Sequence, residues 1–160
     1  MSAVRPFAMA LVVLGVAGCG DGTGLGGSIG ESFSLGYDRV QLRKQGESLL
    51  IEYIEEAARS NEKVCKVVVD TGGLGLGGGS KLEGDLFREH VAVQRVAYTG
   101  GDFPPVTEGR IELGELDFVA GGRVSGSFDV IFELPSIGEQ TEERSLYGSF
   151  SGDLVEVPID

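Results

Sequence analysis

Hydrolytic chemistry in this chain would have to use its one histidine, its carboxylates or a serine. His90 is the only histidine among 160 residues, so a site with two histidine ligands cannot form. A Ser-His-Asp triad would have to include His90, which lies beside an expected strand. The 25 acidic residues provide many carboxylate pairs by chance, but none with a diagnostic spacing. We therefore expect no enzyme, metal or cofactor, with a hydrolase as the weaker alternative.

Two glycine motifs match known patterns but lack their structural context. Residues 73–78 (GLGLGG) fit G-x-G-x-x-G, yet the residues that follow form helices poorly, and a dinucleotide site needs a helix there. Residues 26–30 (GGSIG) fit the nucleophile elbow G-x-S-x-G, but no strand precedes Ser28. We interpret both as chance matches in a chain with 27 glycines, and residues 71–80 as a loop.

The first nineteen residues have the order of a secretory signal. Arg5 is the only charge, residues 7–16 are uncharged and mostly apolar, and small residues then lead into a cysteine. The apolar run is too short to span a bilayer. This segment resembles the signal peptide of bacterial lipoproteins. Its lipobox consists of Val16, Ala17 and Gly18, followed by Cys19.

The resemblance implies a lipid anchor on Cys19. In that family the cysteine thiol receives a diacylglyceryl group, the signal (here residues 1–18) is removed, and acyl chains hold the protein on a membrane. Gly20, rather than Asp, follows the cysteine, which favours the outer membrane over the inner one by the family's sorting rule. Residues 19–28 are glycine-rich and predict a flexible tether. The alternatives are an ordinary secretory signal with a coincidental cysteine, or an uncleaved anchor.

Composition limits what the remaining chain can be. Removal of residues 1–18 from the 160 leaves 142, with 12 basic and 25 acidic side chains and a net charge of −13. That length suits one domain with a real core, and the charge argues against nucleic acid as a partner. Cys65 becomes the only free thiol, so no intramolecular disulfide can form. Its apolar neighbours predict a buried, unreactive cysteine.

Alternating hydrophobicity predicts strands in most of the mature chain. Residues 123–134 and 146–154 alternate with period two, and the turn between them predicts a long hairpin. The apolar phase changes at Gly114, which predicts a bulge. Further strands are expected at 32–35, 39–43, 64–70, 81–87, 91–98 and 110–118.

Residues 47–59 fit two structures. Leu50, Tyr53 and Ile54 have helical spacing, whereas Leu49, Ile51 and Tyr53 alternate as in a strand. We favour the strand. Residues 29–160 then form a single all-β, mainly antiparallel domain, which is a sandwich or a small barrel of about eight strands.

One loop and one edge are candidates for recognition. Residues 100–106 hold a stiff apolar element, which either plugs one end of a barrel or contacts a partner. An exposed strand edge would be a natural place for a partner to add a strand. The residues of the loop that could contact a partner are Phe103, Pro104 and Pro105.

These features together predict a lipid-anchored protein of the cell envelope. We expect a non-catalytic interaction or structural module that contacts an envelope protein, with a lipocalin-like carrier of a small apolar ligand as the alternative. A carrier needs an interior cavity, whereas a module would have a filled core. The rings expected to fill that core are Phe33, Phe128, Phe132 and Phe150.

Overall fold

The computed structural model describes residues 22–57, 60–97, 100–135, 138 and 141–158. In these ranges the chain forms nine strands, one short α-helix and one 3-10 helix. The elements, in chain order, are β1 (Gly24–Gly26), η1 (Ser28–Glu31), β2 (Arg39–Gln45), β3 (Ser48–Ala57), β4 (Ser60–Asp70), β5 (Lys81–Glu83), α1 (Gly84–His90), β6 (Val91–Val96), β7 (Val106–Leu116), β8 (Arg123–Leu134) and β9 (Glu142–Glu156).

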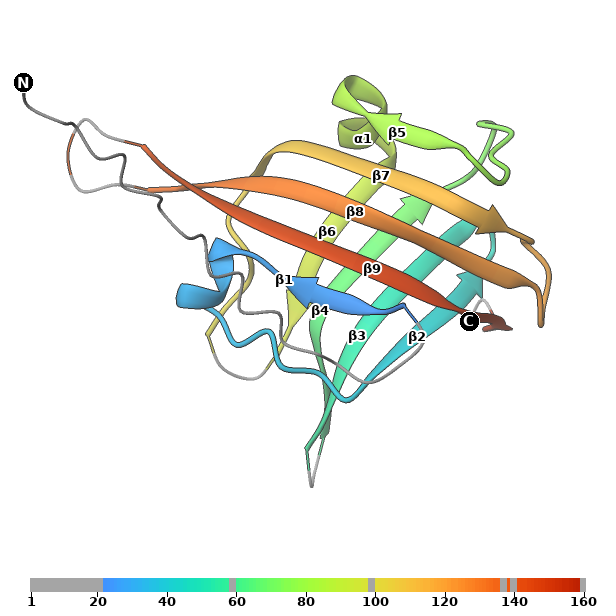
Figure 1. The fold of residues 1–160 in the computed structure, drawn as a ribbon, viewed down its shortest axis with the longest axis horizontal. Helices are drawn as coiled ribbons and strands as arrows, with labels where there is room; N and C mark the ends of the chain where they lie inside the picture. Colours follow the sequence, from blue (N-terminus) through green and yellow to red (C-terminus); the bar gives the residue numbers. More distant parts are fainter. Residues whose placement is uncertain (1–21, 58–59, 98–99, 136–137, 139–140, 159–160) are drawn as a thin grey trace, which may run out of the picture.

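The strands belong to one curled sheet that forms a half-barrel. Eight of them follow the order β5-β7-β8-β9-β2-β3-β4-β6, so that β7, β8 and β9 cross in front of β3, β4 and β6 in Figure 1. Neighbouring strands are antiparallel except β2 and β9, which pair in parallel through residues such as Leu42 and Leu154. β1 pairs with β9 beside this path. The prediction of an all-β sandwich or small barrel is confirmed.

The strongest alternating pattern forms the predicted hairpin. β8 and β9 pair from Arg123 opposite Asp153 to Leu134 opposite Glu142. The register of β7 and β8 shifts between Leu113 and Glu115, so the bulge predicted at Gly114 is confirmed. Seven inward-facing residues of the hairpin are fully buried, namely Val124, Phe128, Val130, Phe132, Leu146, Phe150 and Leu154.

The disputed segment is a strand, as favoured from the sequence. β3 covers Ser48–Ala57 and turns Leu49, Ile51 and Tyr53 toward the core, where they are completely buried. Leu50 and Ile54, on the opposite face, are also buried. Apolar residues on both faces of one strand produce a mixed periodicity, which explains the apparent helical spacing.

Two expected strands were wrong in part or in whole. The strand expected at 81–87 ends at Glu83, because Gly84 takes a φ of +59° and α1 begins there. The helix places Phe87 in the core against Gly109, where a Cβ atom would approach Cζ of the ring to 2.5 Å. Residues 32–35 follow η1 and form no strand.

The predicted tether is also wrong over its second half. Gly24–Gly26 pair with Ser149, Gly148 and Tyr147 of β9. Gly27 lies so close to β9 that a Cβ atom there would be 2.8 Å from the Cα atom of Leu146. Glycine here permits close approach of two backbones rather than flexibility. The tether before Gly24 stays a prediction, and residues 19–21 lie outside the described ranges.

Glycines inside the hairpin make room for aromatic rings, and this can be tested by substitution. A Cβ atom at Gly126 would lie 2.7 Å from the Phe150 ring. We expect Gly126→Ala to lower the free energy of unfolding by about 1–3 kcal/mol, because overpacking displaces the ring or the strand. Urea denaturation measures this change. Gly77→Ala is the control, because its Cβ atom would contact nothing within 4 Å. Equal stabilities of the two variants would contradict the packing argument.

Candidate functional site

A groove runs beside β6 at one border of the sheet. Its volume is about 460 Å³, and it is lined by residues 93–97 together with Asp102 and Phe103. β6 ends the strand order and pairs only with β4 in the described part of the chain. The second edge of β6 therefore has no strand partner among the described residues. We take this groove, called the β6 groove, as the main candidate site.

Arg95 closes the inner side of the β6 groove. The alternation of β6 turns Arg95 toward the core with Val91, and only 6% of the residue is exposed. Its Cζ atom lies 5.5 Å from the centre of the Phe33 ring, and Nη1 donates a hydrogen bond of 3.3 Å to the carbonyl oxygen of Gly101. The ring face and the carbonyl both stabilise the buried cation. Sequence analysis missed Arg95, although its even spacing from Val91 and Val93 placed it on the inward face.

Phe103 connects the β6 groove to the core. Its ring lies 5.3 Å from that of Phe33, edge to face, and 5.2 Å from that of Phe132. Pro104 is half-buried and Pro105 is exposed. Phe103 thus packs as expected of a plug, and it also lines the groove. A role of Phe103, Pro104 or Pro105 in recognition stays a prediction.

A second notable feature is the buried carboxylate of Glu52. Glu52 on β3 is completely buried. Nη1 of Arg43 lies 3.2 Å from Oε2, and Nζ of Lys63 lies 3.0 Å from Oε1. These cations come from the two neighbouring strands, β2 and β4, and they compensate the charge that β3 buries.

Four cations share this side of the sheet. Arg39 and Arg43 on β2 lie opposite Ile54 and Leu50 of β3, while Lys66 on β4 lies opposite Glu52. Because side chains of paired residues point to the same face, these cations lie on the outer face with Glu52. We call this surface the basic wall; its residues are Arg39, Arg43, Lys63 and Lys66. It is notable in a chain with a net charge of −12.

Lys66 differs from the other cations of the basic wall. Arg39 pairs with Glu56 at 2.6 Å, and Arg43 and Lys63 hold Glu52. Lys66 is half-buried and forms no ion pair with any residue that the structure describes. Its charge is therefore available to a partner.

Of the remaining polar candidates, Ser28 is hydrogen-bonded, whereas Nδ1 of His90 has no hydrogen-bond partner among the described residues. Nδ1 of His90 lies 4.0 Å from Oδ2 of Asp70, at the end of α1. The hydroxyl of Ser28 accepts a hydrogen bond of 2.9 Å from the Ser145 amide. The loop 73–78 leads into β5 and not into a helix. Within the described ranges, no group of three or more His, Cys, Asp or Glu residues is placed to hold a metal ion.

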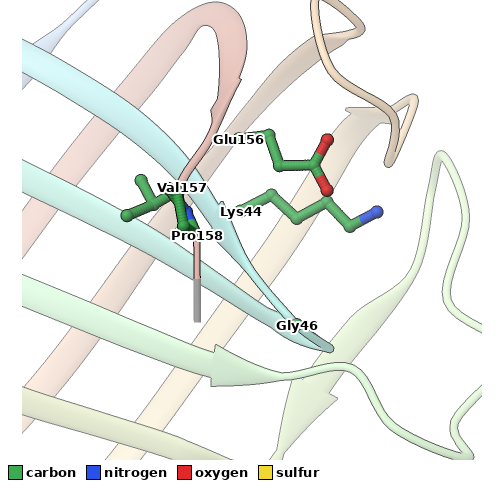
Figure 2. Close-up of a pocket in the computed structure, with 5 residues that line it drawn as sticks. All are labelled: Lys44, Gly46, Glu156, Val157 and Pro158. Carbon is green, nitrogen blue, oxygen red and sulfur yellow. The ribbon is translucent and has the colours of Figure 1, made fainter. Parts of the chain in front are cut away.

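A second cavity lies at the C-terminal end of β2. It has a volume of about 620 Å³ and is lined by Lys44, Gly46, Glu156, Val157 and Pro158. Figure 2 shows the Lys44 and Glu156 side chains extending to one side, with Val157 and Pro158 on the other. Nζ of Lys44 lies 5.1 Å from the centre of the Phe118 ring. The cation of Lys44 is thus directed toward a ring.

Cys65 is buried and free, as predicted. Burial raises the pKa of its thiol far above the ordinary value, so the sulfur stays protonated and unreactive at neutral pH. Cys19 and the lipobox residues lie outside the described residues. None of the helices that the structure describes is long and apolar enough to cross a membrane.

The Glu52 cluster predicts unequal costs for two cation deletions on the basic wall. We expect Lys63→Met to lower the free energy of unfolding by about 1–3 kcal/mol, since it removes one counter-charge from a buried carboxylate. Arg39→Met is the matched control. It breaks an ion pair whose side chains are 40% and 54% exposed, and such pairs contribute about 0–1 kcal/mol. Urea denaturation of both variants checks this, and an equal loss would refute the special role of Glu52.

The buried thiol predicts how stability depends on pH. Burial raises the pKa of the Cys65 thiol in the native state. The contribution of this thiol to the free energy of unfolding is therefore full below its ordinary pKa of 9.0 and falls as the pH rises above 9.0. The unfolded chain then loses a proton that the native state keeps. The slope attributable to this thiol is about 1.4 kcal/mol per pH unit. Burial raises the pKa of Tyr53 similarly, from 10.0. The test is urea denaturation of the wild type and of Cys65→Ala from pH 7 to 10. The variant should lose the decline in the free energy of unfolding near pH 9 and keep the decline that Tyr53 causes near pH 10. The same pH dependence in both proteins would contradict the prediction.

Comparisons of this chain with protein-family models, with curated proteins and with solved structures found no match.

Proposed function

We propose that this chain is a lipid-anchored cell-envelope protein whose β domain serves as a non-catalytic interaction or structural module. The observation that carries the proposal is the sequence of residues 16–19, Val-Ala-Gly-Cys, after a short uncharged apolar segment. Cys19 would be the first residue of the mature chain and its covalent membrane anchor. Gly20 after the cysteine favours the outer membrane.

The short distance along the chain between Cys19 and β1 would limit how far the sheet stands from a lipid anchor. β1 begins at Gly24 and is paired with β9. Five residue steps separate Cys19 from Gly24, and fully extended chain spans at most about 3.6 Å per step, or roughly 18 Å. Acyl chains on Cys19 would thus hold the β1–β9 region of the domain close to the headgroups.

The core supports a module more than a carrier. The rings of Phe128, Phe132 and Phe150 are buried inside the half-barrel, and the hydroxyl of Tyr53 donates a hydrogen bond of 2.7 Å to the carbonyl oxygen of Ser149 across it. An apolar ligand of any size would have to displace these rings. The β6 groove lies at the border of the sheet instead, where a protein partner has access.

Intact mass and detergent partitioning test the anchor. Expressed in a Gram-negative host, the wild-type chain should begin at Cys19, carry the mass of acyl chains and enter the detergent phase. Cys19→Ala should carry no acyl mass. Cys65→Ala is the matched control, because this buried cysteine should leave lipidation unchanged. A wild-type product without acyl mass would refute the lipid anchor.

A further inference from the structure

We propose that the open edge of β6 binds an extended segment of a partner protein whose outward-facing side chains are acidic. The proposal rests on the function proposed above, since it specifies how the module contacts an envelope partner. It follows from the edge, the groove beside it and the basic wall.

The edge of β6 carries no lysine and no proline, two residues that commonly prevent strand addition. Inward-pointing charges and bulges also protect edges. The inward charge of β6 is held by Phe33 and Gly101, and the register shift between β4 and β6 places the additional residue on β4. β6 reads Val-Ala-Val-Gln-Arg-Val, and its one charge, Arg95, points inward and is 6% exposed. Val96 is 52% exposed on the other face. The part of β6 beside the groove, residues 93–96, spans about 13 Å, and an extended segment would pair along it.

The β6 groove determines which side chains fit on the inner side of an added strand. The residues that line the groove include Val93 and Phe103, so small apolar side chains of the segment would be buried against them. Asp102 is exposed at the groove and Arg95 is already held by a ring and a carbonyl. An acidic side chain on the inner side would therefore meet Asp102.

The basic wall determines the chemistry on the outer side. Lys66 and Lys63 on β4 lie opposite Gln94 and Val96 of β6. Neither β6 residue carries a charge. An added strand would lie two strand spacings from β4, or about 10 Å, within reach of a lysine and a glutamate that extend toward each other. Lys66 has no ion pair among the described residues, so a carboxylate on the segment would provide its partner.

A second copy of this chain fits the edge less well. The outer face of β6 carries Ala92, Gln94 and Val96, so a second β6 would bring no carboxylate to Lys66. Charge complementarity therefore favours a different protein with an acidic, extended segment.

Fluorescent peptides provide the test with the full mature chain in detergent. The first peptide has about eight residues that alternate Glu with Val or Thr. The second replaces each Glu with Lys, and the third carries backbone N-methyl groups that remove its hydrogen-bond donors. By fluorescence anisotropy, we expect the acidic peptide to bind and the other two to bind at least about tenfold more weakly.

Two charge-reversal variants locate the site. Lys66→Glu should weaken binding of the acidic peptide at least about fivefold. Lys81→Glu causes the same change in net charge on β5, where Lys81 faces Glu112 at 3.8 Å, and it should change binding less than about twofold. Circular dichroism melting of both variants confirms that each is folded.

Several outcomes would overturn the proposal. These are equal binding of acidic and basic peptides, undiminished binding of the N-methylated peptide, or no effect of Lys66→Glu in a folded protein. Sedimentation showing a stable dimer without peptide binding would instead assign the edge to a second copy. The Cys19→Ala chain is tested in parallel. If it binds the peptide although the wild type carries no acyl mass, the lipid anchor fails and the β6 proposal stands.

Discussion

The fold depends on close contacts between aromatic rings and glycine backbone inside the curled sheet. Phe128 lies over Gly148, Phe150 over Gly126 and Phe87 over Gly109, and at each glycine a Cβ atom would overlap the ring. A half-barrel brings strands from different parts of the sheet to one axis, where space is limited. Rings at some positions and hydrogen at others fill that space at the density of a protein interior.

The sheet has two borders, β5 and β6, and different elements lie beside them. α1 connects β5 to β6 and places Phe87 in the core. The helix therefore packs beside both strands where β5 ends and β6 begins. At the other end, Phe103 fills the interior but leaves the edge of β6 beside an open groove. Within the described residues, the half-barrel thus has a filled centre and, at β6, a strand edge beside a groove.

Charge is distributed unevenly over the domain. The chain is strongly acidic, yet Arg39, Arg43, Lys63 and Lys66 gather on the outer face of β2 and β4 around buried Glu52. Charges farther apart than a Debye length, about 8 Å at physiological salt, are largely screened. A partner at β6 would therefore experience the nearby lysines more than the distant carboxylates.

The sequence alone predicted those strands that have one buried and one exposed face, because apolar and polar residues alternate along them. It predicted β8, β9, the bulge at Gly114 and the buried Cys65 correctly. Tertiary structure alone decided features that depend on distant neighbours. Gly24–Gly26 became a strand because β9 offered a free edge beside β2, and Gly84 allowed a helix where alternation predicted a strand. Glu52 and Arg95 are buried because Arg43, Lys63, Phe33 and Gly101 compensate their charges. Phe33 lies far from Arg95 in sequence, whereas Arg43, Lys63 and Gly101 lie within about a dozen residues of the charges they compensate. Strand pairing and the turn after β6 bring these nearby residues together, so hydrophobic periodicity alone could not reveal them.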